Sequence, residues 1–207
     1  MTRQNRVTPY GEIIAVPERG TLMGNRGCLH DAQGRVTKRS ARPAWVTCLL
    51  SFNGRQRKVM SPGQYTELFF LDEATALAAG HRPCATCQRD RYNEFRMLWE
   101  RVHPGQSLIA EVDRTLQRSR YATAGNDALW KADRSQWVDG LFVADARFPY
   151  AVALLCNARL HPWTPGGYGA PVAIATTAQA TVVTPKPVVD VIRAGFRPRV
   201  HSSISDD

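Results

Sequence analysis

Two cysteines three positions apart, Cys84 and Cys87, give the clearest chemical signal in the sequence. A C-x-x-C pair can direct two thiolates at one tetrahedral ion, with sulfur–zinc distances of about 2.3 Å. The same spacing also occurs in redox dithiols, which normally follow a strand and open a helix, and in pairs of buried thiols. Here a predicted helix and Pro83 come before the pair. This context favours a structural zinc site over a redox pair.

Three residues compete for the two remaining positions of a tetrahedral site: Cys28, His30 and Cys48. A structural zinc takes four Cys or His ligands and leaves no position for water. Cys28 and His30 are two residues apart, so on an extended segment they share one face. Cys48 lies in an apolar run and, without the C-x-x-C pair, would be interpreted as a buried thiol. Cys156 follows Ala-Leu-Leu and is predicted to be a core thiol.

The segment around the pair resembles the zinc-binding domain of Ada, the bacterial DNA-alkylation repair family. The stretch "EATALAAGHRPCATCQRD" has the helix ending in Ala-Ala-Gly, the Arg-Pro-Cys and the second Cys of that domain. The likeness covers about Thr21 to Arg89, and it is specific over Phe69 to Arg89 and weaker over Thr21 to Cys48. The segment is also similar to a related zinc domain appended to some bacterial nucleases.

This resemblance implies one structural Zn²⁺ ion. In the nuclease-linked relatives a His and a Cys precede Pro-Cys-x-x-Cys, which implies the ligand set His30, Cys48, Cys84 and Cys87. Ada itself has a Cys on its first strand that is closely followed by another, which would point to Cys28. No second cysteine follows Cys28 within a few residues. His81 occupies a position where the relatives carry an aromatic or apolar side chain, so we interpret it as a packing or exposed residue and not as a ligand.

Positive charge is concentrated at one end of the chain. The formal net charge is +9, and residues 1–60 contain 11 Lys or Arg against three acidic residues. A basic patch beside a zinc turn is typical of polyanion binding, although a solvated basic face without a partner is the alternative. The residues predicted to contact nucleic acid are Arg26, Arg55, Arg57, Lys58 and Arg82.

Several function classes lack their signals in this sequence. No apolar run approaches the roughly 20 residues of a membrane span, and the N-terminus lacks the apolar core of a signal peptide. Five cysteines, an odd number, argue against a disulfide framework and for a reducing compartment. H-E-x-x-H, G-x-S-x-G, Walker and Rossmann motifs do not occur. We therefore expect a cytoplasmic protein with no membrane partner, and leave its oligomeric state open.

The spacing of apolar residues predicts an α+β fold with two units. Residues 1–120 are expected to form a basic, Ada-like zinc-binding β-hairpin and helix unit that is extended by two amphipathic helices. Residues 141–207 are expected to form a small, mostly antiparallel β unit with a closing C-terminal helix. The character of the sequence changes from amphipathic helices to short strands with Pro and Gly turns across a polar link at 122–140. Residues 1–20 are predicted to be an irregular lead-in.

Individual elements can also be placed. Asp72 can cap a short helix that Gly80 ends. A hairpin is predicted over residues 45–60, because Asn53-Gly54 suits a two-residue turn with positive φ at both positions. Three longer helices are expected at about residues 89–102, 107–119 and 186–194.

Three functions are compatible with these features. The first is a zinc-stabilised basic protein that binds nucleic acid, with DNA favoured. The second is a DNA-repair or nucleic-acid-processing enzyme in which a zinc-bound Cys28 or Cys48 is the nucleophile, as the Ada resemblance implies. The third is a zinc-stapled protein-interaction domain whose charge serves solubility.

Overall fold

The fold consists of two β-sheets joined by helices, in a computed structural model that describes residues 2–54, 58–121, 129–174 and 179–204. The first sheet has six strands. They are β1 (Gln4–Val7), β2 (Ile13–Ala15), β3 (Leu22–Asn25), β4 (Val46–Leu49), β5 (Leu68–Phe70) and β6 (Arg82–Pro83). The second sheet has seven strands. They are β7 (Trp130–Asp133), β8 (Phe142–Ala144), β9 (Val152–Cys156), β10 (Arg159–Thr164), β11 (Gly167–Tyr168), β12 (Val172–Ala173) and β13 (Gln179–Val182).

The first sheet is mixed, with the strand order β2-β1-β5-β3-β4-β6. Its β1–β5 and β4–β6 pairs are parallel, and the remaining neighbours are antiparallel. The parallel pair at the β4–β6 end matters most for function. It places the strand that carries Cys48 directly beside the strand that leads into the C-x-x-C turn.

Two sequence-based expectations for this half are wrong. The turn at Asn53-Gly54 forms with positive φ at both residues, 51° and 65°. Strand β4 before it, however, pairs with β3 and β6, so both of its edges are occupied and it does not pair with the described residues 58–60 after the turn. Residues 55–57 lie outside the described residues. The supposed irregular lead-in instead contains the antiparallel pair β1–β2, in which Val7 faces Ile13.

Helix α1 (Glu73–Ala78) has the two ends predicted for it. Asp72 accepts a hydrogen bond from the backbone N–H of Thr75 at 2.8 Å. At the other end Gly80 adopts a φ of 78° and donates to Leu77, while the N–H of His81 donates to the carbonyl of Ala76. This pair of bonds is a Schellman motif, which favours glycine because of the left-handed backbone. The helix therefore ends sharply and turns the chain toward the C-x-x-C pair.

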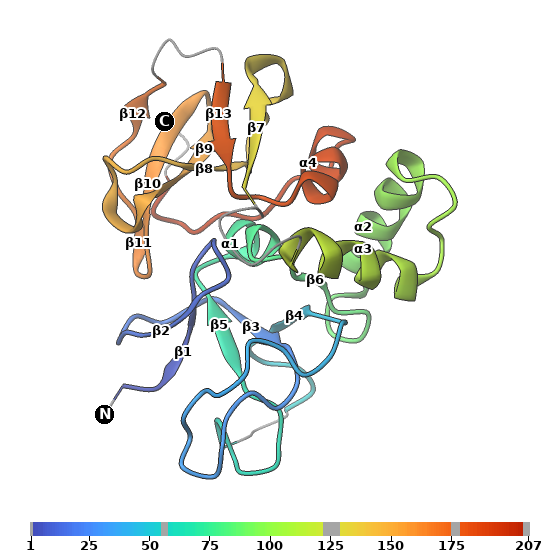
Figure 1. The fold of residues 1–207 in the computed structure, drawn as a ribbon, viewed down its shortest axis with the longest axis vertical. Helices are drawn as coiled ribbons and strands as arrows, with labels where there is room; N and C mark the ends of the chain where they lie inside the picture. Colours follow the sequence, from blue (N-terminus) through green and yellow to red (C-terminus); the bar gives the residue numbers. More distant parts are fainter. Residues whose placement is uncertain (1, 55–57, 122–128, 175–178, 205–207) are drawn as a thin grey trace.

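Three longer helices gather beside the junction of the sheets: α2 (Arg89–Val102), α3 (Ile109–Tyr121) and α4 (Lys186–Arg193). Figure 1 shows them side by side, with α1 between the two sheets. The apolar stripe of α2, including Phe95 and Trp99, packs with Leu116 of α3 and Val188 and Ile192 of α4. The structure contains all three helices, at approximately the bounds predicted from the sequence.

The second sheet is antiparallel throughout, with the order β11-β10-β9-β8-β13-β7 and with β12 paired to β10. The C-terminal part is thus a mostly antiparallel β unit with a helix after it, as predicted. The expected polar link at 122–140 contributes strand β7 to this sheet, which the sequence-based prediction missed. Residues 122–128 of that link lie outside the described residues.

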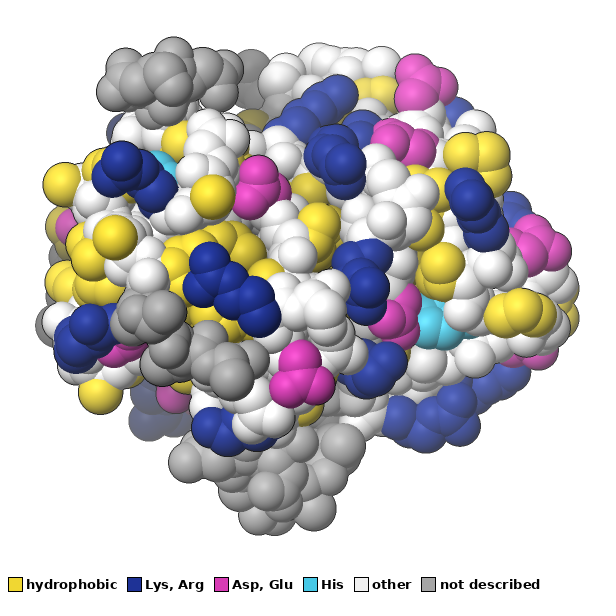
Figure 2. Space-filling view, turned by 90° about the horizontal axis from the view of Figure 1, so that it is seen from above, with side chains coloured by type: hydrophobic (Ala, Val, Ile, Leu, Met, Phe, Trp, Pro, Cys, Tyr) yellow, Lys and Arg dark blue, Asp and Glu magenta, His cyan; other side chains and the backbone are white. Residues whose placement is uncertain are grey.

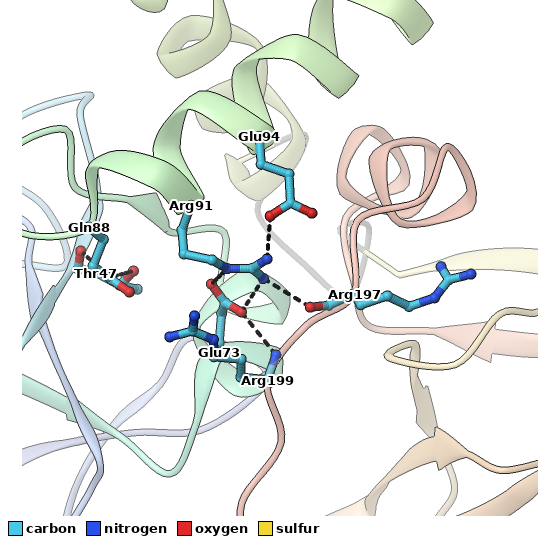
Figure 3. Close-up of polar contacts among 7 residues, drawn as sticks. All are labelled: Thr47, Glu73, Gln88, Arg91, Glu94, Arg197 and Arg199. Carbon is cyan, nitrogen blue, oxygen red and sulfur yellow. Dashed lines mark hydrogen bonds and ion pairs between the residues drawn. The ribbon is translucent and has the colours of Figure 1, made fainter.

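The two sheets share apolar clusters. Leu71, Ala74 and Ala78 from the first half pack with Phe142 and Trp163 from the second sheet. Polar contacts add to this, as Figure 3 shows. The buried carboxylate of Glu73 binds the Arg91 guanidinium at 2.5 Å and accepts from the backbone N–H of Arg199 at 2.9 Å. The predicted units 1–120 and 141–207 are therefore in direct contact through α1, α2 and the C-terminal segment.

No helix in the described parts of the chain has the length and apolar character needed to cross a membrane.

Asp72 offers a direct test of this junction. Its buried carboxylate caps α1 and also accepts from the Tyr168 hydroxyl at 2.7 Å and from the backbone N–H of His201 at 2.9 Å. Asp72→Ala removes a cap worth about 1 kcal/mol and leaves buried donors unsatisfied at about 1–3 kcal/mol each. We expect urea unfolding to show a loss of about 3 kcal/mol or more. Asp90→Ala, at an exposed site in the first turn of α2, is the matched control, and equal small losses for both variants would contradict this account.

Candidate metal centre

Three cysteines from two segments meet at one end of the first sheet. Cys48 lies on β4, and Cys84 and Cys87 lie in the turn between β6 and α2. Their three Sγ atoms all lie within 4.8 Å of one another, and each residue is half-buried. This separation suits three thiolates around a single ion, because sulfur ligands stand about 2.3 Å from a tetrahedral zinc. None of the five cysteines, all of which are described, is in a disulfide.

Backbone pairing positions the C-x-x-C turn against β4. Thr47 lies opposite Pro83 in the parallel ladder, and the N–H of Cys84 donates to the Thr47 carbonyl at 2.9 Å. The buried side-chain amide of Gln88 donates to the Thr47 carbonyl at 2.9 Å and to its hydroxyl at 3.0 Å. Figure 3 shows this Gln88–Thr47 contact at the start of α2. The turn is thus fixed from both ends, by β6 before it and by Gln88 after it.

Gln88 was missed by the sequence-based prediction. Its signal in the sequence is weak, since it is only a polar residue directly after Cys87 and directly before a helix. Nothing in that position alone identifies the partner 41 residues earlier in the chain.

The surroundings of the three sulfur atoms favour a negative charge on Cys84. Backbone N–H groups of Thr86 and Leu49 point at the sulfurs of Cys84 and Cys87, each at 3.4 Å. A hydrogen bond from the Cys48 thiol lowers the pKa of Cys84 to about 4, and the same contact, together with burial, raises the pKa of Cys48. Burial raises the pKa of Cys87. The opposite shifts of Cys48 and Cys84 have the same first cause, which is the hydrogen bond between these two residues. A bound cation would instead favour the thiolate form of all three.

His30 and Cys28 do not join this group among the described residues. The His30 ring is buried, with Nδ1 2.6 Å from the Thr66 hydroxyl and Nε2 3.3 Å from the Ser61 carbonyl. The Cys28 sulfur contacts the His30 carbonyl at 3.7 Å. The structure therefore assembles three of the four ligands predicted from the sequence and engages the fourth, His30, elsewhere.

All three cysteines line one cavity of about 470 Å³. The face of the first sheet supplies much of its wall, because Met23 lies opposite both Cys48 and Phe69 in the strand register. Polar side chains also line it, among them Arg42, Asn25 and the buried Glu67. Glu67 is held in place by the backbone N–H of Met60, which donates to its carboxylate at 2.7 Å.

Two of the predicted nucleic-acid contacts lie in the protein interior. Arg26 is 1% exposed, donates to the carbonyl of Gly11 at 3.0 Å and stacks 3.9 Å above the Trp45 ring. Arg82 is 6% exposed and pairs with Asp113 at 2.7 Å. Neither guanidinium is placed to meet a phosphate on the surface, because each is held by internal partners. Lys58 is exposed, and Arg55 and Arg57 lie outside the described residues.

His81, interpreted from the sequence as a packing or exposed residue, is fully buried between the rings of Trp45 and Phe70. Burial, followed by the positive charges of Arg26 and Arg120, holds the pKa of His81 well below its usual range. The neutral ring accepts a hydrogen bond from Arg26 at 3.2 Å.

No known family model, curated protein or solved structure matches this chain. The Ada-like resemblance over about residues 21–89 therefore stays a prediction from the residue pattern. The structure supports a narrower statement, which is that Cys48, Cys84 and Cys87 form a group that could hold a metal ion such as zinc.

The first prediction for this centre concerns metal content. We expect about one zinc ion per chain, and Cys84→Ser should lose it. Because metal binding at such a site is coupled to folding, the variant should also be less stable by several kcal/mol. Native mass spectrometry measures the first effect and thermal unfolding the second. Cys156→Ser, in the second sheet, is the matched control and should keep the ion.

The second prediction concerns Gln88. Removing a group that orients a ligand segment typically lowers metal affinity about 10- to 100-fold. We expect a loss of roughly tenfold for Gln88→Ala, because the C-x-x-C turn is released from Thr47. Competition with a chromophoric chelator measures this loss, and Asn93→Ala, at an exposed position on α2, is the control. Equal affinities for the two variants would show that the turn is fixed without Gln88.

Proposed function

We propose that the protein is a zinc-stabilised nucleic-acid-binding protein, with DNA as the favoured partner. The observation that carries the proposal is the placement of exposed positive charge around the three-cysteine cavity. Arg42 lines that cavity together with the cysteines. Lys58 lines a neighbouring cavity, and Glu67 lines both that cavity and the three-cysteine cavity.

The loop between β3 and β4 supplies Arg42 and carries further exposed positive charge. Its exposed basic residues are Arg35, Lys38, Arg39 and Arg42. Both ends of the loop enter strands of the first sheet, and the second of these strands carries Cys48. A metal ion at the three-cysteine centre would tie β4 to the start of α2, and would thereby fix the end of the basic loop. Zinc would then act on nucleic-acid binding through positioning and not through contact.

The charge on the rest of the molecule is balanced. Residues 61–207 contain 16 Lys or Arg and 15 Asp or Glu. Figure 2, which views the molecule from the end of the second sheet, shows Lys and Arg interspersed with Asp, Glu and apolar side chains. Long-range attraction of a polyanion would therefore be directed toward the first sheet, where the positive excess lies.

An enzyme that uses a zinc-bound cysteine is the second candidate, and one observation favours it. Of the two cysteines considered as nucleophiles, Cys48 belongs to the three-cysteine group and lines the cavity, whereas Cys28 does not belong to the group. Intact-mass analysis after incubation with alkylated DNA tests this candidate. A mass increase that maps to Cys48 would support the enzyme. An unmodified chain would exclude this candidate and leave nucleic-acid binding as the proposed function.

Three exposed basic residues of the first half of the chain provide the test of the leading proposal. We expect the substitution of Lys38, Arg42 and Lys58 by Gln to weaken binding and to flatten its salt dependence, because each lost phosphate contact changes the slope of log affinity against log salt by roughly 0.7–0.9. Fluorescence anisotropy with single-stranded DNA, double-stranded DNA and RNA at two salt concentrations measures both effects.

The matched control removes the same charge elsewhere. Lys131, Arg159 and Arg193 are exposed positions on β7, β10 and α4. Their replacement by Gln should leave the affinity nearly unchanged. Absence of binding by the intact chain at low salt would remove the proposed function, and equal weakening by both triple variants would show that only net charge matters.

A further inference from the structure

We propose that an ion at the three-cysteine centre keeps one coordination position open to the cavity, and that this position binds the thiol of a small molecule with an apolar body. The proposal rests on the metal-binding part of the proposed function and goes beyond its nucleic-acid part. It assigns a ligand to the three-cysteine cavity. Neither the fold nor nucleic-acid binding explains why this cavity is present.

The open position follows from the donors that are present. The three sulfurs form a group without a fourth His, Cys, Asp or Glu among the described residues. His30, the fourth ligand expected from the sequence, is engaged with Thr66 and Ser61. A zinc site with three protein ligands takes its fourth ligand from solvent or from a substrate. Because Cys48, Cys84 and Cys87 all line the cavity, a fourth ligand would come from the cavity side.

The cavity has the size and lining of a small-molecule site. Its volume of about 470 Å³ lies within the range of roughly 300–1,000 Å³ that is usual for such sites. Met23, Val46 and Phe69 give it an apolar wall next to the sulfurs. Asn25 lies two residues from Met23 along β3, and the buried Glu67 carboxylate lies two residues from Phe69. A ligand that fits would therefore coordinate the ion through one group, present apolar surface to this wall and could donate a hydrogen bond to Asn25 or Glu67.

The chemistry of the site selects a thiol as the coordinating group. Three thiolates already give the ion a soft, electron-rich environment, which favours a further sulfur ligand over a hard oxygen ligand. On binding, the S–H bond of the ligand breaks and a sulfur–metal bond forms. The proton passes to solvent, and the water that held the position leaves.

Cobalt(II) makes this position visible by absorption spectroscopy. The experiment uses the full chain loaded with cobalt(II) and two probes of equal shape, 2-phenylethanethiol and 2-phenylethanol. We expect the thiol to cause a saturable rise of roughly one third in the thiolate-to-cobalt charge-transfer band, because the sulfur ligands increase from three to four. The alcohol should cause no such rise. A spectrum that the thiol leaves unchanged, or a loss of cobalt to the thiol, would overturn the proposal.

Two variants on β4 test whether the thiol enters through the cavity. Val46→Phe fills space beside Cys48 and should weaken the thiol response by about tenfold, while the spectrum without thiol shows that the three-sulfur site is intact. Val46→Thr nearly conserves the volume of the side chain and should respond like the unmodified chain. Equal responses of all three proteins would overturn the proposal.

His30→Ala decides whether the fourth position is open. We expect its cobalt spectrum to equal that of the unmodified chain, and a change that indicates the loss of a nitrogen ligand would overturn the proposal. Failure of the proposal can be separated from failure of the proposed function. Absence of cobalt binding removes the metal-binding part of both, whereas cobalt binding without a thiol response removes only this inference.

Discussion

The parallel pairing of β4 with β6 is the constraint on which the functional end of this protein depends. Cys48 and the C-x-x-C turn are far apart in the sequence, and only this pairing brings their sulfurs together. The pairing is short, since β6 consists of Arg82 and Pro83. It is reinforced by the Cys84 N–H and by Gln88, both of which bind the backbone of Thr47. A metal ion shared by the three sulfurs would join the same two segments and add metal–sulfur bonds to the few backbone hydrogen bonds there.

Helix α1 connects this end to the rest of the molecule. It is buried along its whole length, and its first turn carries two buried carboxylates, Asp72 and Glu73. Each of them accepts a backbone N–H from the C-terminal segment, from His201 and Arg199 respectively. Buried carboxylates are costly unless they are paired or hydrogen-bonded, so these contacts make the position of the C-terminal segment specific. The Schellman turn at the other end of α1 then aims the chain at β6. One short helix thereby fixes the relation between the second sheet and the metal centre.

Local signals in the sequence were sufficient for the elements with short-range causes. The Asp72 cap, the Gly80 stop, the apolar stripe of α2 and the C-x-x-C turn depend on residues within a few positions of one another, and the structure contains each of them. The neighbours of β4 could not be predicted in this way. An Asn-Gly turn indicates that the chain reverses, but it does not determine which strands pair with the two edges of β4. Strand β7 was missed for a related reason. Its polar residues Lys131 and Asp133 face solvent, and the strand exists only because β13 pairs with it.

The candidate site was predictable in its sulfur ligands and not in its histidine. Cys48, Cys84 and Cys87 come together as expected, whereas the ligand order of similar domains gave no information about Thr66, which engages the His30 ring. Likewise, net charge located the basic end of the chain but could not separate Lys58, which is exposed, from Arg26 and Arg82, which are internal.

X-ray absorption spectroscopy of the zinc-loaded chain tests the central claim most directly, because it counts the atoms around the ion by type. The account predicts three sulfur atoms at about 2.3 Å and one lighter, exchangeable atom, without the outer-shell scattering of an imidazole ring. A folded chain that binds no zinc would contradict the account, as would a first shell with fewer than three sulfurs.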